Sequence, residues 1–233
     1  MRKQYLENAI ILQARLGSTR FPKKIFKKIL NKTILEYLIN RLKISKLTKK
    51  IIVATTTKKI DLPIVKLCRR MKIDCFRGSE KDVLKRYFDC AKKYNVKNII
   101  RITSDCPLVD PFLIDKMYLI FKKKKIDYLS NTTPIYKSQF PNGMDIEIFN
   151  FESLKKANST IKSVKYREHV TNQFWGDLKY KSCIYGIKRN LSNLRITLDY
   201  PSDLVLIKKI ILRFRNRYSY RLNDILKYLR YKN

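Results

Sequence analysis

Short apolar runs alternate with amphipathic helical patterns through the first half of this chain, and polar residues follow most of these runs. The runs that indicate strands are Ala9 to Gln13, Ile51 to Thr55, Ile73 to Phe76 and Asn98 to Thr103. Strands that alternate with helices over short connections are typical of a mostly parallel sheet covered on both faces. We therefore expect a three-layer α/β fold, and the 233 residues are enough for a single domain with one substantial core.

Local capping patterns mark where the helices of the first half begin. Thr33 and Glu36 have the spacing of a capping box, in which a hydroxyl and a carboxylate each accept a backbone N–H. The other helices of this half are expected to open at Asp61 with Pro63, at Ser79 as the cap of a helix over about 81–94, and at Asp110 with Pro111.

The second half of the chain is less regular. Its patterns predict a turn into a strand over Asn142 to Phe149, an amphipathic helix over Tyr166 to Trp175, strands over Ser182 to Ile187 and Leu194 to Leu198, and helices from about Pro201 and Asn223. We therefore expect a mostly parallel, mixed sheet.

Three polar stretches lie at the carboxyl ends of predicted strands: Arg15 to Lys24, Thr55 to Thr57, and Ser104 with Asp105. The carboxyl ends of parallel strands form one edge of the sheet, and ligands of such folds bind at that edge. We therefore expect these stretches to converge on a nucleotide or a sugar phosphate.

The first of these stretches lies in the sequence QARLGSTRFPKK and has the groups that bind a phosphate. Gly17 and Ser18 belong to a turn of small residues with free backbone N–H donors, and Arg15, Arg20 and Lys24 can neutralise phosphate oxygens. The loop lacks the second glycine, followed by lysine and a hydroxyl residue, that a Walker-type loop requires. An ordinary charged surface loop is the alternative interpretation.

The formal net charge of +34 indicates an anionic partner. The excess is spread along the whole chain, so it attracts a nucleoside triphosphate as well as a nucleic acid. The sequence contains no recognisable nucleic-acid-binding module and no cluster of aromatic residues for base stacking. We expect no specific nucleic-acid partner, and a nucleic-acid-binding protein is kept as an alternative.

The cysteine and histidine content limits the possible metal sites. The five cysteines are odd in number and lack close pair spacing, which indicates reduced thiols. His169 is the single histidine, so a metal would be held by carboxylates, which favours Mg²⁺. No apolar run reaches the roughly 18 residues of a membrane span, and the polar N-terminus does not resemble a signal peptide, so we expect a cytoplasmic protein.

Seven motifs, in order, make the chain resemble a known family. They are QARLGSTRFPKK, VATTT, FRGSEKDVLKRY, RITSDCPLVDP, FPNGMDIEIF, YREHVT and RITLDYPSDLVLI, and they span about residues 9–211. The chain resembles the CTP-dependent sugar cytidylyltransferases, which include the CMP-acylneuraminate and CMP-Kdo synthetases. It is most similar to the branch represented by spore-coat polysaccharide biosynthesis protein F. The resemblance implies a sheet of the nucleotide-diphospho-sugar transferase type.

The resemblance also implies a reaction. A hydroxyl of a sugar acid, or of a related sugar, attacks the α-phosphorus of CTP and gives a CMP-sugar and pyrophosphate, for surface polysaccharide or glycan biosynthesis. Such a reaction requires charge neutralisation and in-line placement around the triphosphate, and Mg²⁺ supplies both. A glycosyltransferase of similar fold that uses a nucleotide sugar is the alternative. The spacing of the carboxylates in DCPLVD tells mildly against it.

Functional residues of the family match particular positions of this chain. Asp105 and Asp199 match the metal-binding carboxylates, and Arg15, Lys24 and Asp105 are the expected catalytic residues. The expected nucleotide-binding residues are Ala14, Arg15, Gly17, Ser18, Arg20, Lys24, Thr55, Thr56 and Asp105. Considered without the resemblance, both aspartates are equally explained as turn or helix-cap residues.

The same resemblance places the acceptor sugar near Asp145 and Glu147, which alternate along a predicted strand, with Arg167 and His169 as further contacts. A solvated strand face and a structural histidine are the alternatives. The segment over about 132–181 is expected to be a lobe that binds the acceptor and forms a homodimer, as in related synthetases. The motif SDCP and the pair Thr19–Arg20 depart from several family members, which leaves the acceptor sugar open.

Overall fold

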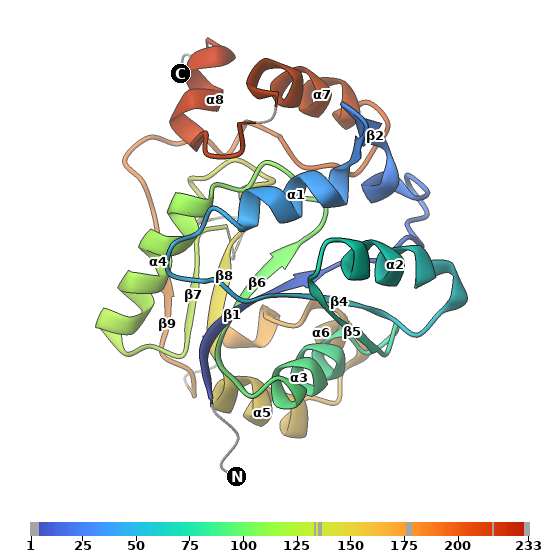
Figure 1. Ribbon diagram of the computed structural model, residues 1–233. Coiled ribbons are helices and arrows are strands. Elements are labelled where there is room, and N and C mark those ends of the chain that lie inside the picture. The colour runs from blue at the N-terminus through green and yellow to red at the C-terminus, as the bar shows by residue number, and fades with distance from the viewer. Residues whose placement is uncertain (1–4, 133, 135–136, 176–178, 216, 231–233) are drawn as a thin grey trace.

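The computed structural model describes residues 5–132, 134, 137–175, 179–215 and 217–230. Within these residues, seven strands form one mixed sheet in the order β5-β4-β1-β6-β8-β7-β9 (Figure 1). The strands are β1 (Leu6–Gln13), β4 (Ile51–Thr56), β5 (Asp74–Gly78), β6 (Val96–Thr103), β7 (Tyr128–Ser130), β8 (Glu147–Asn150) and β9 (Ser182–Ile184). A separate hairpin pairs β2 (Lys28–Ile29) with β3 (Lys32–Thr33).

The centre of the sheet confirms the parallel arrangement predicted from the sequence. β1 pairs in parallel with β4 on one side and with β6 on the other, and β5 extends the sheet beyond β4. β8 runs antiparallel to both β6 and β7, which makes the sheet mixed. Residues 9–12 of β1 are fully buried because both faces of a central parallel strand are covered.

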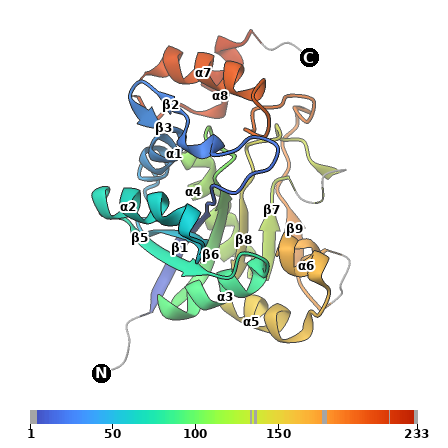
Figure 2. The ribbon, with the colours of Figure 1, turned by 90° about the vertical axis from the view of Figure 1, so that its right-hand side faces the viewer.

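Helices on both faces complete the three layers (Figure 2). One core is built against the sheet by α1 (Ile34–Leu42), α2 (Leu62–Arg70), α4 (Pro111–Lys124), α7 (Asp203–Phe214) and α8 (Leu222–Tyr228), and a second core by α3 (Val83–Lys93) and α5 (Phe151–Thr160). Ile100 of β6 lies in the first core and Ile99 in the second. Successive side chains of a strand point to opposite faces, so one strand supplies both cores.

The helix starts are confirmed in part. The Thr33 hydroxyl accepts the Glu36 N–H at 3.1 Å and the Glu36 carboxylate accepts the Thr33 N–H at 2.7 Å, so the predicted capping box is present. The prediction that Ser79 caps the third helix is wrong. That helix begins at Val83, and Asp82 is its N-cap. Ser79 instead accepts the backbone N–H of Asp82 at 3.0 Å, which orients the cap.

The predicted helix over Tyr166 to Trp175 is also corrected. The chain forms a short helix, α6 (Val164–His169), and then a separate 3-10 turn at Asn172–Phe174. Val170 has a φ of 63°, which the α-helix does not allow, and this residue ends α6.

Two predicted strands of the second half differ from the structure. β9 ends at Ile184, three residues before the predicted end at Ile187. The strand expected over Leu194 to Leu198 does not belong to the sheet of described residues, where this segment forms a single bridge, between Asn142 and Arg195. The backbone N–H groups of Ile196 and Leu198 donate to the carbonyls of Asn142 and Asp105, which lie in loops and not in strands.

The order of the strands reverses between β1 and β6. The chain passes from β1 through α1 to β4 on one side, and from β6 through α4 to β7 on the other side. Folds of this class bind their ligands at the carboxyl ends of two strands whose connections diverge in this way. The loops that follow Gln13 and Thr103 are therefore the positions at which the fold favours a site.

Candidate active site

The loop after β1 is folded by its own backbone. The N–H groups of Ser18 and Lys23 both donate to the carbonyl of Leu16, at 2.9 and 3.3 Å. Lys23 has a φ of 54°, and Lys24 then occupies the first position of a 3-10 helix, Lys24–Phe26. This turn brings the Lys24 side chain, of which only 11% is exposed, back toward the sheet edge.

The segment before α7 brings a carboxylate to the same edge. The N–H of Leu198 donates to the carbonyl of Asp105 at 2.8 Å, and the Thr197 hydroxyl donates to that carbonyl at 3.1 Å. The N–H of Asp199 donates to Asp203 at 2.7 Å at the start of α7. Asp105 and Asp199 are distant in the sequence, but these bonds hold them next to each other.

Lys24 connects the two carboxylates. Its Nζ lies 2.9 Å from Asp199 and 3.7 Å from Asp105. Arg20 and Arg195 each reach Asp199 at 3.0 Å. We call these five residues the charge cluster. Four of them, Arg20, Lys24, Asp105 and Asp199, are residues that the sequence had placed in the site.

The cations of the charge cluster stabilise the ionised form of Asp199. Burial acts to raise the pKa of Asp199, but the hydrogen bond and charge of Lys24, with those of Arg195 and Arg20, outweigh burial and lower the pKa from 3.8. Asp203 has a lowered pKa for the same reason, because its bonds to Arg195 and to backbone N–H groups outweigh the effect of burial.

We expect acid to destabilise the fold through Asp199. Its pKa is lower in the folded chain than the ordinary 3.8, so its contribution to stability is complete above about pH 4 and is lost as the pH falls through the folded pKa. Urea unfolding between about pH 6 and pH 3 should show a smaller loss on acidification for Asp199→Asn than for the wild type. An identical pH dependence for the two proteins would contradict this expectation.

Arg15 is not a member of the charge cluster. Its side chain is exposed, and no hydrogen bond or ion pair within the described residues joins it to Asp105 or Asp199. Its charge acts instead on Arg86 of α3, whose pKa is lowered mainly by burial and further by Arg15. Ala14 is buried, and its N–H donates to Ala54 at 3.2 Å. Gly17 is exposed in the middle of the loop.

Two threonines at the end of β4 lie beneath this loop. Thr55 and Thr56 are both fully buried. The Thr56 hydroxyl donates to Asp61, and a carboxylate oxygen of Asp61 accepts the backbone N–H of Leu16 at 2.7 Å. The sequence pattern indicates for Asp61 only the start of a helix. Its bonds connect β4 to the loop.

Asp145 lies on the other side of Asp105. It precedes β8 rather than lying within it, and its carboxylate accepts the Gly143 N–H at 2.8 Å. The thiol of Cys106 lies between the two carboxylates, 3.4 Å from Asp145 and 3.7 Å from Asp105. Burial, with the charge of Asp105 as a smaller contribution, raises the pKa of Asp145. Gly143 has a φ of 104° and lies so close to the backbone of Ile196 that a Cβ would clash.

The other three expected acceptor contacts lie elsewhere. Glu147 is buried and bonds Arg101, Tyr128 and Thr171. Arg167 donates to Asp82 at 2.8 Å and to carbonyls near the end of α5, which ties α6 to α3. His169 is exposed at the end of α6. The structure thus places Asp145 beside the charge cluster and does not gather all four residues around one acceptor.

Three residues around Asp199 were missed by the sequence analysis. Arg195 bonds both Asp199 and Asp203, and the Tyr200 hydroxyl accepts from Arg20 at 3.4 Å. The motif RITLDYPSD contains Arg195, Asp199 and Asp203 at intervals of four residues, which is the only local indication of this network.

The two carboxylates fit a divalent cation. Mg²⁺ is commonly bound by one or two carboxylates together with substrate phosphates and water. The ammonium of Lys24 stands near both Asp105 and Asp199, so the two carboxylates already converge on one positive charge. In the described part of the chain, no group of three or more His, Cys, Asp or Glu side chains is arranged to hold a metal. A cation here would therefore need further ligands from the nucleotide.

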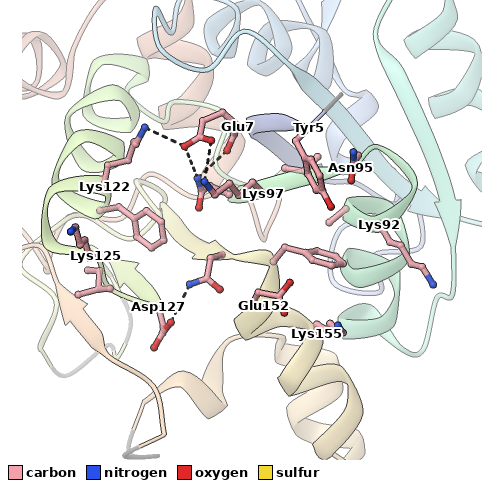
Figure 3. Close-up of a pocket in the computed structure, with 17 residues that line it drawn as sticks. Tyr5, Glu7, Lys92, Asn95, Lys97, Lys122, Lys125, Asp127, Glu152 and Lys155 are labelled. Atoms are coloured by element: carbon pink, nitrogen blue, oxygen red, sulfur yellow. Dashed lines mark hydrogen bonds and ion pairs between the residues drawn. The ribbon is translucent and has the colours of Figure 1, made fainter. Parts of the chain in front are cut away.

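A large hollow lies at the opposite, amino-terminal edge of the sheet (Figure 3). Its volume is about 1020 Å³, and none of the predicted site residues lines it. Two of its three carboxylates already have partners: Glu7 pairs with Lys97 and Lys122, and Asp127 accepts from Asn150 at 3.1 Å. The strand reversal and the charge cluster, and not this hollow, indicate the position of the candidate site.

A mostly parallel, mixed sheet with a cationic loop and converging carboxylates at its strand reversal is the arrangement expected of an α/β nucleotidyltransferase. A family model described as cytidylyltransferase matches residues 9–228. The chain therefore belongs to the cytidylyltransferase family and is a nucleotidyltransferase. Among the described residues, none of the helices has the length and apolar character needed to cross a membrane.

Three individual proteins are similar to this chain over most of their own length. The solved structure of a cytidylyltransferase from Leptospira borgpetersenii is 34% identical, with a TM-score of 0.91, and the match covers 97% of this chain and 94% of that one. The spore coat polysaccharide biosynthesis protein SpsF of Bacillus subtilis is 33% identical over 69% of this chain and 67% of its own. The uncharacterized protein MJ1063 of Methanocaldococcus jannaschii is 40% identical over 84% of this chain and 79% of its own.

Proposed function

We propose that this protein is a Mg²⁺-dependent enzyme that transfers CMP from CTP to a hydroxyl of a sugar acid or a related sugar. The observation that carries the proposal is the position of the Lys24 ammonium, which lies within reach of both Asp105 and Asp199 at the strand reversal of a cytidylyltransferase sheet. The similarity to a protein of spore coat polysaccharide biosynthesis supports a role in making surface polysaccharide or glycan.

In the proposed reaction, an oxygen of the acceptor hydroxyl bonds to the α-phosphorus of CTP, and the bond from that phosphorus to the bridging oxygen of pyrophosphate breaks. Lys24 and Arg20, with Arg15 and the turn of Gly17 and Ser18, bind and orient the triphosphate. Asp105 and Asp199 would hold Mg²⁺, which offsets the charge of the phosphate oxygens. Nearby cations already hold Asp199 in its ionised form, which a metal ligand requires.

Asp145 is the proposed link to the acceptor. It neighbours Asp105 across the Cys106 thiol, so an acceptor bound to it would lie next to the reacting phosphate. Its raised pKa suits a carboxylate that takes the proton of the attacking hydroxyl. Glu147 and Arg167 are occupied by structural partners, which leaves Asp145 as the best supported of the expected acceptor contacts.

A pyrophosphate-release assay tests the proposal. Each of the four nucleoside triphosphates would be combined with a panel of sugar acids in the presence of Mg²⁺. We expect release with CTP and one class of sugar acid, and loss of the reaction when EDTA is added. A glycosyltransferase would release no pyrophosphate, and salt-sensitive DNA binding that CTP does not compete would favour a nucleic-acid-binding protein.

We also propose that the region over about 132–181 forms a homodimer contact. α6 has no buried residue, and Val164 and Tyr166 on it are 76% and 46% exposed. Light scattering should give a dimer at micromolar concentration for the wild type and a larger monomer fraction for Val164→Asp. Leu119→Asp, at an exposed residue of α4, is the control and should remain dimeric. A monomeric wild type would contradict the proposal.

A further inference from the structure

Asp61 is a buried carboxylate with an unusual set of partners. It is 1% exposed, and it stands in the N-cap position of α2 without bonding the N–H groups of that helix. One of its oxygens accepts the Leu16 N–H at 2.7 Å, and the other accepts the Thr56 hydroxyl. Burial of a carboxylate is costly unless it is hydrogen-bonded, so these two bonds are the compensation that the structure provides.

Leu16 is the central residue of the loop that follows β1. Its N–H is held by Asp61, and its carbonyl accepts from the N–H groups of Ser18 and Lys23. Lys23 directly precedes Lys24, the cation of the charge cluster. A shift of the backbone at Leu16 would therefore move both the turn at Gly17 and the backbone that positions Lys24.

The second partner of Asp61, the Thr56 hydroxyl, holds the Asp61 carboxylate in place. The Thr56 hydroxyl belongs to the last residue of β4, a central strand of the sheet, and its oxygen also accepts the Lys58 N–H at 3.2 Å. The loop is thus connected to the rigid part of the sheet through one carboxylate, which lies 45 positions from Leu16 in the sequence. A loop that is held in this way before the ligand arrives loses less entropy on binding.

We propose that Asp61 is a positioning residue of the nucleotide site, which holds the backbone at Leu16 so that the loop and Lys24 are preorganised for the triphosphate. The inference rests on the proposed function. Asp61 touches neither proposed substrate and acts through the backbone of the loop. Its effect should therefore fall on the nucleotide and not on the acceptor.

The test compares Asp61→Ala with Asp61→Asn in the full-length enzyme. Alanine removes both bonds, and we expect the KM for CTP to rise about tenfold or more, with a change in the acceptor KM of less than about twofold. Asparagine keeps one oxygen for the Leu16 N–H and offers its amide to the Thr56 oxygen. It should restore the CTP KM to within about threefold of the wild type. Equal rises in both KM values, or a wild-type CTP KM in Asp61→Ala, would overturn the proposal.

Asp115→Ala is the matched control. Asp115 of α4 also accepts backbone N–H groups, those of Lys46 at 2.8 Å and Leu47 at 3.2 Å, as well as the Ser45 hydroxyl. It ties down a loop that contains no residue of the proposed site. Its replacement should lower the midpoint of urea unfolding while the CTP KM stays at the wild-type value. A similar rise in the CTP KM would show that general loosening explains the Asp61 result.

A second variant and a second measurement cover the remaining outcomes. If Asp61→Ala does not fold, Thr56→Val removes only one of the two bonds and should raise the CTP KM by a smaller factor. Hydrogen exchange should show faster exchange of the Leu16 amide in Asp61→Ala and near-normal protection in Asp61→Asn. Unchanged protection of the Leu16 amide in Asp61→Ala would overturn the positioning role, whether or not the wild type releases pyrophosphate. A wild type that releases no pyrophosphate would count against the proposed reaction and not against the positioning role.

Discussion

Asp105→Asn should lower the rate of CTP-dependent pyrophosphate release by about 10²- to 10³-fold. Asparagine has nearly the same shape, but it lacks the negative charge that would hold a divalent cation against the triphosphate. The loss should appear in kcat, because the charge acts on the phosphate oxygens that gain charge in the transition state. Steady-state kinetics at saturating CTP and acceptor would measure it.

The same substitution should leave the stability of the fold almost unchanged. The Asp105 side chain is 34% exposed, and its nearest cation, Lys24, lies at 3.7 Å and has a shorter contact with Asp199. The backbone carbonyl of Asp105, which anchors the segment before Asp199, is retained in the variant. Asp89→Asn, which removes an exposed i,i+4 partner of Lys85 on α3, is the control and should keep full activity. Wild-type turnover in Asp105→Asn would refute the metal assignment.

The sequence predicted the parts of this fold whose pattern is local. Residues 9–12 and 51–54 are continuous apolar runs because helices cover both faces of the strands, and such runs are visible without any knowledge of partners. Residues 194–198 show the limit of this reasoning. Leu194, Ile196 and Leu198 alternate and are buried, as a strand would be, but their backbone bonds go to Asn142 and Asp105 in loops. The alternation of apolar and polar residues indicates which side chains are buried. It does not indicate which backbone groups form hydrogen bonds with the segment.

In the candidate site too, residues in local motifs could be predicted, whereas residues whose partners lie far away in the sequence could not. Lys24, Asp105 and Asp199 could be proposed because they occur in recognisable motifs at strand or loop ends. Asp61 could not, because aspartate shortly before Pro63 has the pattern of a helix start and its true partners lie on other elements. The partners of Glu147 could not be predicted for a similar reason. Its alternation with Asp145 suggested a shared face, whereas its charge partner is Arg101 on β6.

Glu147→Ala should destabilise the protein by about 3–5 kcal/mol, since it leaves a buried charge without its partner. Glu147 is 4% exposed, and it accepts from Arg101, the Tyr128 hydroxyl and the Thr171 hydroxyl. Burial alone would lower the pKa of Arg101, but the charge of Glu147 outweighs burial and raises it. Within the described residues, the Nε of Arg101 is buried without a hydrogen-bond partner and Gln13 accepts from the guanidinium only at 3.5 Å, so Glu147 is its main partner. Urea unfolding at neutral pH would measure the loss.

Two further variants decide between this structural role and a contact with the acceptor sugar. Glu147→Gln keeps an acceptor for Tyr128 and Thr171 but leaves Arg101 without a counter-charge, so its stability should fall between those of the wild type and Glu147→Ala. The double variant Arg101→Met with Glu147→Leu removes both charges and should be clearly more stable than Glu147→Ala, because no buried charge is left unpaired. If Glu147 bound the acceptor instead, Glu147→Gln would keep the wild-type stability and raise the acceptor KM. The buried position of Glu147 and its three side-chain bonds favour the first result, with an acceptor KM that stays unchanged below the unfolding transition.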